Sequence, residues 1–285
     1  MILYEIKDCF IGEVLKRPSQ YCKTPYVADV VLDSGELIMA HSPSLGCRGL
    51  ADKDAKIVLS KKDSSKTKCS HTVELSIYKE NDKQTVVGIN PGVAETIAEN
   101  ALKKNCILGL KFNKAYAKQT KILNSRFDFT GIDCLGNPFI MEVKNVPLAD
   151  YVDVPKKERK KHEKLIKNSK YNEKIAYFPD GYQKASKDVV SPRALKHIQE
   201  LEEIAKTSRT RTILCFVVQR EDASSFQPSN IDPTYKKAVQ KAWLNGVEIK
   251  VIQVKWNKNG ICEFIRNDLP INLFEECGPY REEDC

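Results

Sequence analysis

The sequence of 285 residues lacks any apolar run near the roughly 20 residues that a membrane-spanning helix needs. Its N-terminus, MILYEIKDCF, carries charges within its apolar part and no small-residue cleavage site, so we expect no signal peptide and no membrane partner. The motifs GxxxxGK[ST], GxGxxG and GxSxG are also missing. Their absence excludes, on motif grounds, ATP-driven, dinucleotide-binding and α/β-hydrolase activities.

Metal-ligand spacing of the kind used by zinc sites is missing as well. The ten cysteines contain no C-x-x-C pair, and the four histidines show no ligand spacing. We therefore expect most cysteines to be buried free thiols of an intracellular protein in a reducing compartment, the cytoplasm or the nucleus.

Positive charge is in excess and is concentrated in one segment. The net charge is +8, and residues 153–174 hold nine Lys or Arg against four Asp or Glu. Such a block is typical of a solvated or disordered loop. The other interpretation is a phosphate-binding segment, with these candidate contacts: Lys156, Lys157, Lys160 and Lys161.

Residues 1–84 are dense in short strands and show no convincing helix. Twisted hairpins in some 80 residues predict a small OB-like β-barrel, a fold that can follow a nucleic-acid strand. Arg17, Tyr21 and Lys23 form an aromatic and basic interleave suited to that role, and Arg48 lies in a loop where it can meet a phosphate. The alternative is that all four are ordinary surface or turn residues.

From residue 85 to 266 the pattern changes to mixed α/β. Three helices are predicted to begin at Asn90-Pro91, Ser191-Pro192 and Asp232-Pro233, where a capping residue precedes proline. The nearly uninterrupted apolar run 212–220 predicts a strand buried on both faces. Residues 267–285 read as a polar, loosely attached tail.

The segment 125–146 predicts a β-hairpin that turns at Gly136-Asn137-Pro138. If the loop spans 133–137, Asp128 lies directly across from Glu142, with their Cβ atoms about 5 Å apart. Lys144 shares a strand face with Glu142.

Two carboxylates this close repel each other unless a cation or a proton lies between them, and hard oxygen ligands suit Mg²⁺. The pattern Asp-x(13)-Glu-x-Lys indicates a metal-dependent phosphodiesterase centre, in which Lys144 holds or deprotonates the attacking water. The competing interpretation is an ordinary amphipathic strand with its polar face in water.

Several motifs in one order resemble the sugar fermentation stimulation protein A (SfsA) family. They are SRFDF, MEVKNV, FPDG, SPRALKHIQEL, FVVQR and IDPTY, preceded by RPSQY, DVVLDSGELIMAHSPSLG and VGINPGVAETIAENAL. The resemblance covers the chain nearly end to end, except for a Lys-rich insertion at about 148–176 and the last twenty residues. It implies an OB-like domain followed by a DNA-binding domain with the PD-(D/E)xK nuclease fold.

The resemblance also implies roles for single residues. Asp128 takes the family's aspartate position, and Glu142 and Lys144 take its E-x-K. Glu99 takes the acidic position on the preceding helix, and Gln219 the end of the central strand. Basic and polar positions of the nuclease-like domain that are candidates for nucleic-acid contact are Arg126, Arg193, Lys196 and His197.

We therefore expect a nuclease dependent on Mg²⁺ or Mn²⁺ that acts on nucleic acid, with DNA favoured over RNA. In this interpretation Glu99, Asp128 and Glu142 hold the metal, while Lys144 and Gln219 complete the catalytic centre. The alternative is a non-catalytic DNA-binding regulatory protein that keeps the nuclease fold. A third is that the basic segment and the barrel engage an acidic protein partner.

Overall fold

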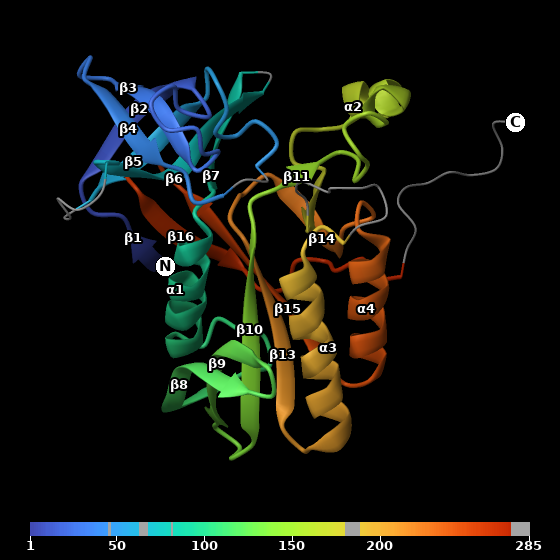
Figure 1. The fold of residues 1–285 in the computed structure, drawn as a ribbon. Helices are drawn as coiled ribbons and strands as arrows, with labels where there is room; N and C mark the ends of the chain where they lie inside the picture. Colours follow the sequence, from blue (N-terminus) through green and yellow to red (C-terminus); the bar gives the residue numbers. More distant parts are fainter. Residues whose placement is uncertain (45–46, 63–67, 81, 180–188, 275–285) are drawn as a thin grey trace, which may run out of the picture.

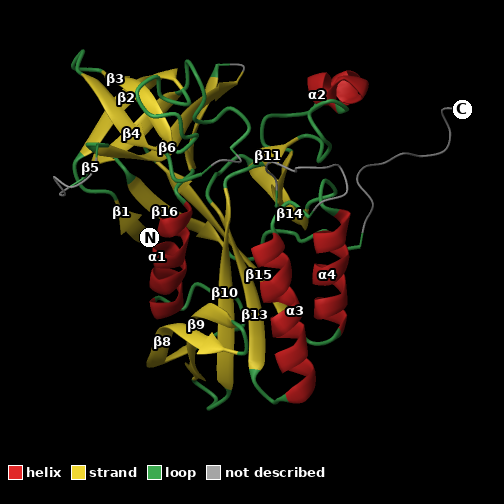
Figure 2. Ribbon diagram, viewed as in Figure 1, coloured by secondary structure: helices red, strands yellow, loops and turns green. Residues whose placement is uncertain are grey.

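The structure is a computed structural model that describes residues 1–44, 47–62, 68–80, 82–179 and 189–274. It contains a six-stranded sheet, a seven-stranded sheet and a small three-stranded sheet, together with four α-helices (Figures 1 and 2). The mixed α/β class predicted from the sequence is confirmed. Asp180 of the FPDG motif and the last eleven residues lie outside the described ranges.

The six-stranded sheet is built by the N-terminal part of the chain. Its strand order is β4-β3-β2-β5-β6-β7, and β4 also pairs with β6, so that five strands form a ring. The bounds are β2 (Cys9–Lys16), β3 (Val27–Leu32), β4 (Leu37–His41), β5 (Lys56–Lys61), β6 (His71–Glu80) and β7 (Lys83–Gly88). A hairpin joins β3 and β4 and turns at Gly35, whose φ of +86° suits glycine.

The seven-stranded sheet carries the predicted hairpin. Its order is β1-β16-β15-β13-β10-β9-β8, in which β10, β13 and β15 are parallel neighbours and the other pairs are antiparallel. The bounds are β1 (Ile2–Glu5), β8 (Phe112–Ile122), β9 (Ser125–Asp133), β10 (Pro138–Val146), β13 (Arg211–Val218), β15 (Glu248–Trp256) and β16 (Ile261–Arg266). The first strand of the chain thus joins this sheet and not the N-terminal one.

Helices cover both faces of the seven-stranded sheet (Figure 1). Helix α1 (Pro91–Lys103) packs on one face, and α3 (Pro192–Thr207) and α4 (Pro233–Leu244) pack on the other. Along β13, residues 213, 215 and 217 join the core under α1, while residues 214, 216 and 218 join the core under α3 and α4. The prediction that this strand is buried on both faces is confirmed.

The three predicted helix starts are confirmed by their caps. The side chains of Asn90, Ser191 and Asp232 each accept a hydrogen bond from a backbone N–H of the first turn, and a proline follows each of them. No described helix is long and apolar enough to cross a bilayer.

The Lys-rich segment is not an irregular loop. It contains a short 3₁₀ turn, η1 (Arg159–His162), and α2 (Glu163–Asn168). It connects β11 (Ala149–Asp150) to β12 (Lys174–Phe178), two strands of the small sheet that β14 (Ala223–Pro228) completes. The buried Asp153 anchors its start, because its carboxylate accepts hydrogen bonds from Gln227, Ser229 and the backbone of Asn230. The segment is held in place by hydrogen bonds to residues that are distant in the sequence. Composition alone does not reveal such bonds.

The described part of the tail is not loosely attached. Leu269 and Leu273 are 3% and 8% exposed and belong to the core beneath α3 and α4. Ile271 forms a β-bridge with Phe226. Two apolar side chains in an otherwise polar stretch are enough to hold residues 267–274 against the domain.

Candidate active site

Asp128 and Glu142 lie side by side in the hairpin of β9 and β10. The ladder pairs Ile140 with Thr130 and Met141 with Phe129, so the next positions along the two strands are Glu142 and Asp128. Here the ladder gives way to a side-chain bond, because the Val143 N–H donates to Asp128 Oδ2 at 2.7 Å. The predicted register is confirmed, and both carboxyl groups are buried.

Where this ladder ends, the side chain of Phe127 lies on the opposite face of the sheet from Phe129. Strict alternation along β9 would place Phe127 on the same face as Phe129, but Phe127 packs in the core under α3, with its ring centroid 5.9 Å from that of His197. Once β9 leaves its partner after Phe129, strict alternation of faces no longer holds.

One oxygen of Glu142 is held by two nitrogen groups. Oε1 accepts hydrogen bonds from Lys144 Nζ at 2.5 Å and from His197 Nδ1. Burial would raise the pKa of Glu142, but the His197 hydrogen bond and the charge of Lys144 outweigh it and lower the pKa. Glu142 is therefore ionised under ordinary conditions.

The other oxygen of Glu142 is buried without a hydrogen-bond partner among the described residues. A buried carboxylate oxygen in that state is costly unless something binds it. Burial and the negative charge of Glu142 also raise the pKa of Asp128 to about 7. Asp128 and Glu142 are therefore hard to ionise together unless a cation binds between them.

A third carboxylate, Glu95 on the first turns of α1, reaches the same place. The Gln119 amide donates to Asp128 Oδ1 at 2.9 Å and to Glu95 Oε2 at 3.1 Å. Gln119 lies on β8 opposite Asp128 and adopts a φ of +52°, a left-handed conformation uncommon for a residue other than glycine. Its amide joins two carboxylates that would otherwise repel each other.

Glu99, the acidic residue expected in the metal shell, is held elsewhere. Its carboxylate accepts hydrogen bonds from Lys103, Lys118 and Tyr116 at 2.7, 2.7 and 2.5 Å. Burial would raise the pKa of Glu99, but these bonds lower it to about 2. Glu99 lies one helical turn, about 5.4 Å, beyond Glu95, and the site faces the start of the helix. The structure therefore brings Glu95, and not Glu99, to Asp128.

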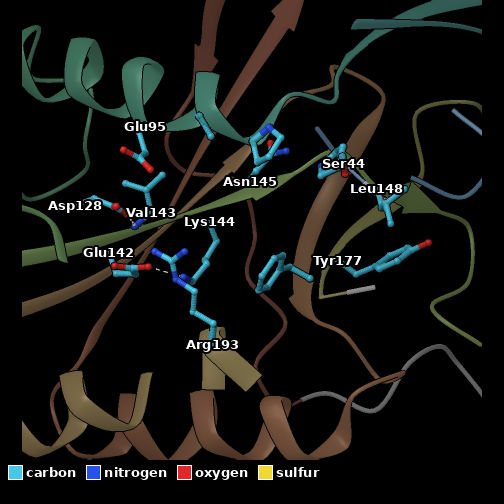
Figure 3. A pocket seen from close by; sticks show the side chains of 14 residues that line it. Ser44, Glu95, Asp128, Glu142, Val143, Lys144, Asn145, Leu148, Tyr177 and Arg193 are labelled. Carbon is cyan, nitrogen blue, oxygen red and sulfur yellow. Dashed lines mark hydrogen bonds and ion pairs between the residues drawn. The ribbon is translucent and has the colours of Figure 1, made fainter. Parts of the chain in front are cut away.

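The carboxylates line a cavity of about 310 Å³, which we call the acidic pocket (Figure 3). Lys144 and Arg193 extend toward Glu142 from β10 and from the start of α3, and Tyr177 and Leu148 form the opposite side (Figure 3). Negative and positive groups thus meet across a space that small molecules or a phosphate can enter.

Gln219 does not contact the carboxylates. Its side chain is buried, donates to Asn145 Oδ1 at 2.5 Å and accepts from Trp256 Nε1 at 3.1 Å. Asn145 lines the acidic pocket, so Gln219 orients the neighbour of Lys144 and acts on the pocket only through it.

The remaining predicted contact residues are spread over the surface. Arg17 is tied to backbone carbonyls of Pro25, Ser44 and Ala51 and holds loops together. Lys196 donates to the Asn124 carbonyl, and Arg48 to that of Val154. Arg48 and Lys196 are nevertheless exposed, as are Tyr21, Lys23, Arg126, Lys156, Lys157, Lys160 and Lys161.

The donor set fits a divalent cation held by few protein ligands. Within the described ranges, no group of three or more His, Cys, Asp or Glu side chains is arranged to hold a metal ion. Asp128 and the free oxygen of Glu142 supply two hard oxygen donors, and Mg²⁺ commonly keeps several waters beside one or two carboxylates.

Comparison with known proteins decides the family. The model of the sugar fermentation stimulation protein RE domain matches residues 152–260. The sugar fermentation stimulation protein homologue of Brucella ovis is 30% identical over 83% of this chain and 86% of its own. The chain belongs to the sugar fermentation stimulation protein (SfsA) family.

Two further likenesses agree. The Brucella anthropi homologue is 30% identical over 78% of this chain and 83% of its own. The solved structure of Pyrococcus furiosus SfsA in complex with Ca²⁺ has a TM-score of 0.71 at 17% identity, and covers 95% of this chain and 99% of that one. The SfsA fold therefore extends over nearly the whole chain.

Sequence reasoning missed three residues of the site. Glu95 was visible as the i, i+4 partner of Glu99, but only the position of the helix decides which of the two faces the hairpin. Asn145 directly follows Lys144, and that position next to a predicted catalytic residue could have marked it as a candidate. Nothing in the sequence marks Gln119. It reaches the two carboxylates only because its backbone adopts an unusual conformation in β8, the strand paired with β9.

Proposed function

We propose that this SfsA-family protein is a metal-dependent nuclease that hydrolyses phosphodiester bonds in the acidic pocket. The observation that carries the proposal is the buried, unpartnered Oε2 of Glu142 beside Asp128, whose pKa is raised to about 7. Glu142 and Asp128 also both line the acidic pocket, so a bound cation can reach this oxygen. A cation bound by both carboxylates satisfies it.

Asp128 and Glu142 hold the cation, with Mg²⁺ or Mn²⁺ as candidates, and Glu95 joins them when Gln119 releases it. When bound, such a cation lowers the pKa of a water and neutralises charge on a phosphoryl oxygen. The relative from Pyrococcus furiosus, solved in complex with Ca²⁺, supports a divalent ion.

Lys144 positions the attacking water and stabilises charge at the phosphate. Its side chain is only 10% exposed, and its ammonium lies between Glu142 and the His197 ring, with Nζ 3.3 Å from Nδ1. His197 keeps the Glu142 carboxylate in place by hydrogen bonding. Arg193, at the pocket's edge, suits a contact with a phosphate.

The rest of the molecule supplies affinity for nucleic acid, DNA in the first instance. In this proposal the ring of strands acts as an OB-like domain over residues 1–84, and residues 85–266 form the PD-(D/E)xK nuclease-like domain. The exposed lysines of 156–161 add electrostatic attraction to phosphates.

A non-catalytic nucleic-acid-binding protein is the second candidate. It is favoured by the tie of Glu95 to Gln119 and by the lack of a three-ligand group among the described side chains. In that case the same carboxylates are structural.

The test is incubation with labelled single- and double-stranded DNA and RNA in Mg²⁺, Mn²⁺ or chelator. We expect cleavage that requires a divalent ion and falls at least 100-fold in Glu142→Gln and Glu95→Gln. Glu99→Gln is the matched control, since it removes a carboxylate from the same helix outside the pocket. Survival of every substrate with wild-type protein would leave the non-catalytic function.

A further inference from the structure

A second cavity, of about 420 Å³, lies next to the acidic pocket, and we call it the junction cavity. It is enclosed by the 47–52 loop, the end of β6, residues 148–150 and the start of the Lys-rich segment. Leu148 and Tyr177 line both cavities, so the two cavities are direct neighbours.

The floor of the junction cavity is fixed by a balanced group of buried charges. Lys174 Nζ lies 2.6 Å from Glu80 Oε2 and 2.7 Å from Asp222 Oδ2. Arg220 binds both oxygens of Asp222 at 2.6 and 2.7 Å. Two cations face two carboxylates, so this group is rigid and has no surplus charge.

The surplus charge of the junction cavity lies at its rim. Apart from the floor group, it is lined by Arg48, Lys156 and Arg159 against Asp52 and Asp150, a net of +1. Lys156 is exposed at the edge, and Arg48 lies 5.2 Å above the ring of Tyr177. The ring of Tyr78 also lines the cavity. Aromatic rings beside cations are the combination that binds single-stranded nucleic acid.

We propose that the junction cavity binds one unpaired nucleotide of the strand whose phosphodiester lies in the acidic pocket. The inference rests on the proposed function and names its substrate class: nucleic acid with an unpaired nucleotide or a strand end next to the cleaved bond. A cavity of this size takes a ligand of small-molecule dimensions and not a duplex. A stacked, paired base must pay the cost of unstacking to enter, and an unpaired base does not.

The test compares binding of a blunt duplex and of the same duplex with an unpaired end, both in chelator so that nothing is cleaved. We expect wild type to prefer the unpaired end at least fivefold, and Lys156→Ala to reduce this ratio at least threefold. Lys157→Ala is the matched control: it removes the same charge from the next residue, which does not line the cavity. It should leave the ratio unchanged.

A second experiment measures, by calorimetry, the binding of free adenosine monophosphate, of adenosine and of inorganic phosphate to the protein. The monophosphate should bind more tightly than either fragment, and Lys156→Ala should weaken it while Lys157→Ala does not. Equal ratios for all three proteins, or no preference for the monophosphate, would overturn the inference. Both readouts are independent of cleavage, so that result would leave the proposed function standing.

Discussion

The two groups of buried charge in this molecule differ in balance. In the floor of the junction cavity, Lys174 and Arg220 match Glu80 and Asp222, and the N···O distances of these ion pairs are 2.6–2.7 Å. In the acidic pocket, Glu142 leaves one buried oxygen unmatched and Asp128 keeps a pKa of about 7. Balanced buried charge supports the fold, whereas unbalanced buried charge indicates a place for a ligand.

The largest expected effect is on the free energy of unfolding, which should fall more for a substitution in the floor group than for one in the acidic pocket. Asp222→Asn leaves Lys174 and Arg220 with only Glu80, so it should destabilise the protein by about 3–5 kcal/mol. Glu142→Gln gives up the buried ion pair with Lys144 but relieves the repulsion that raises the pKa of Asp128, so the two effects offset each other and the net cost should be smaller, about 1 kcal/mol. Urea denaturation in chelator measures both, and a greater loss in Glu142→Gln would break the comparison.

The hairpin of the acidic pocket and the helix starts could be predicted from the sequence. The hairpin, the opposition of Asp128 and Glu142 and the shared face of Lys144 follow from strand alternation and a short turn. The three helix starts follow from a capping residue before proline. These features are local, and local rules suffice for them.

What could not be predicted depends on contacts distant in the sequence. Glu80, Lys174 and Asp222 come from three separate strands or loops, and nothing in their neighbourhoods marks them as partners. The choice of Glu95 over Glu99 depends on where α1 lies along the sheet. The order in 153–174 depends on Asp153 reaching residues 227–230.

The second effect is a pH dependence. Because the folded-state pKa of Asp128 is raised from 3.8 to about 7, its contribution to stability is fully present below pH 4 and is lost as pH rises toward 7. In chelator, Asp128→Asn should therefore be more stable than wild type at pH 8 by up to about 4 kcal/mol, with no such gain at pH 4. Thermal unfolding across this range checks it, and a variant that is less stable at every pH would contradict it.

A third, smaller effect concerns binding without turnover. In chelator, Glu142→Gln lowers the negative charge that a docking phosphate meets, so its affinity for nucleic acid should equal or exceed that of wild type. Lys144→Ala leaves the carboxylates uncompensated and should weaken binding several-fold. Fluorescence anisotropy measures both, and shifts in the same direction would sink the assignment of these two residues.

The smallest effect belongs to the exposed lysines. Replacing Lys156, Lys157, Lys160 and Lys161 with Ala should flatten the dependence of log affinity on log salt by up to about 0.9 per lost duplex contact. Sequence preference should stay the same, because phosphate contacts carry no base information. An unchanged slope would assign the segment to solvent or to an acidic protein partner.

The most direct measurement is calorimetric titration of Mn²⁺ and Mg²⁺ into the protein without nucleic acid. The unbalanced charge of the acidic pocket predicts saturable binding to the wild type and to Glu99→Gln, and a loss of at least tenfold in affinity in Glu142→Gln and Asp128→Asn. Absence of binding to the wild type, or equal binding to all four proteins, would contradict the account.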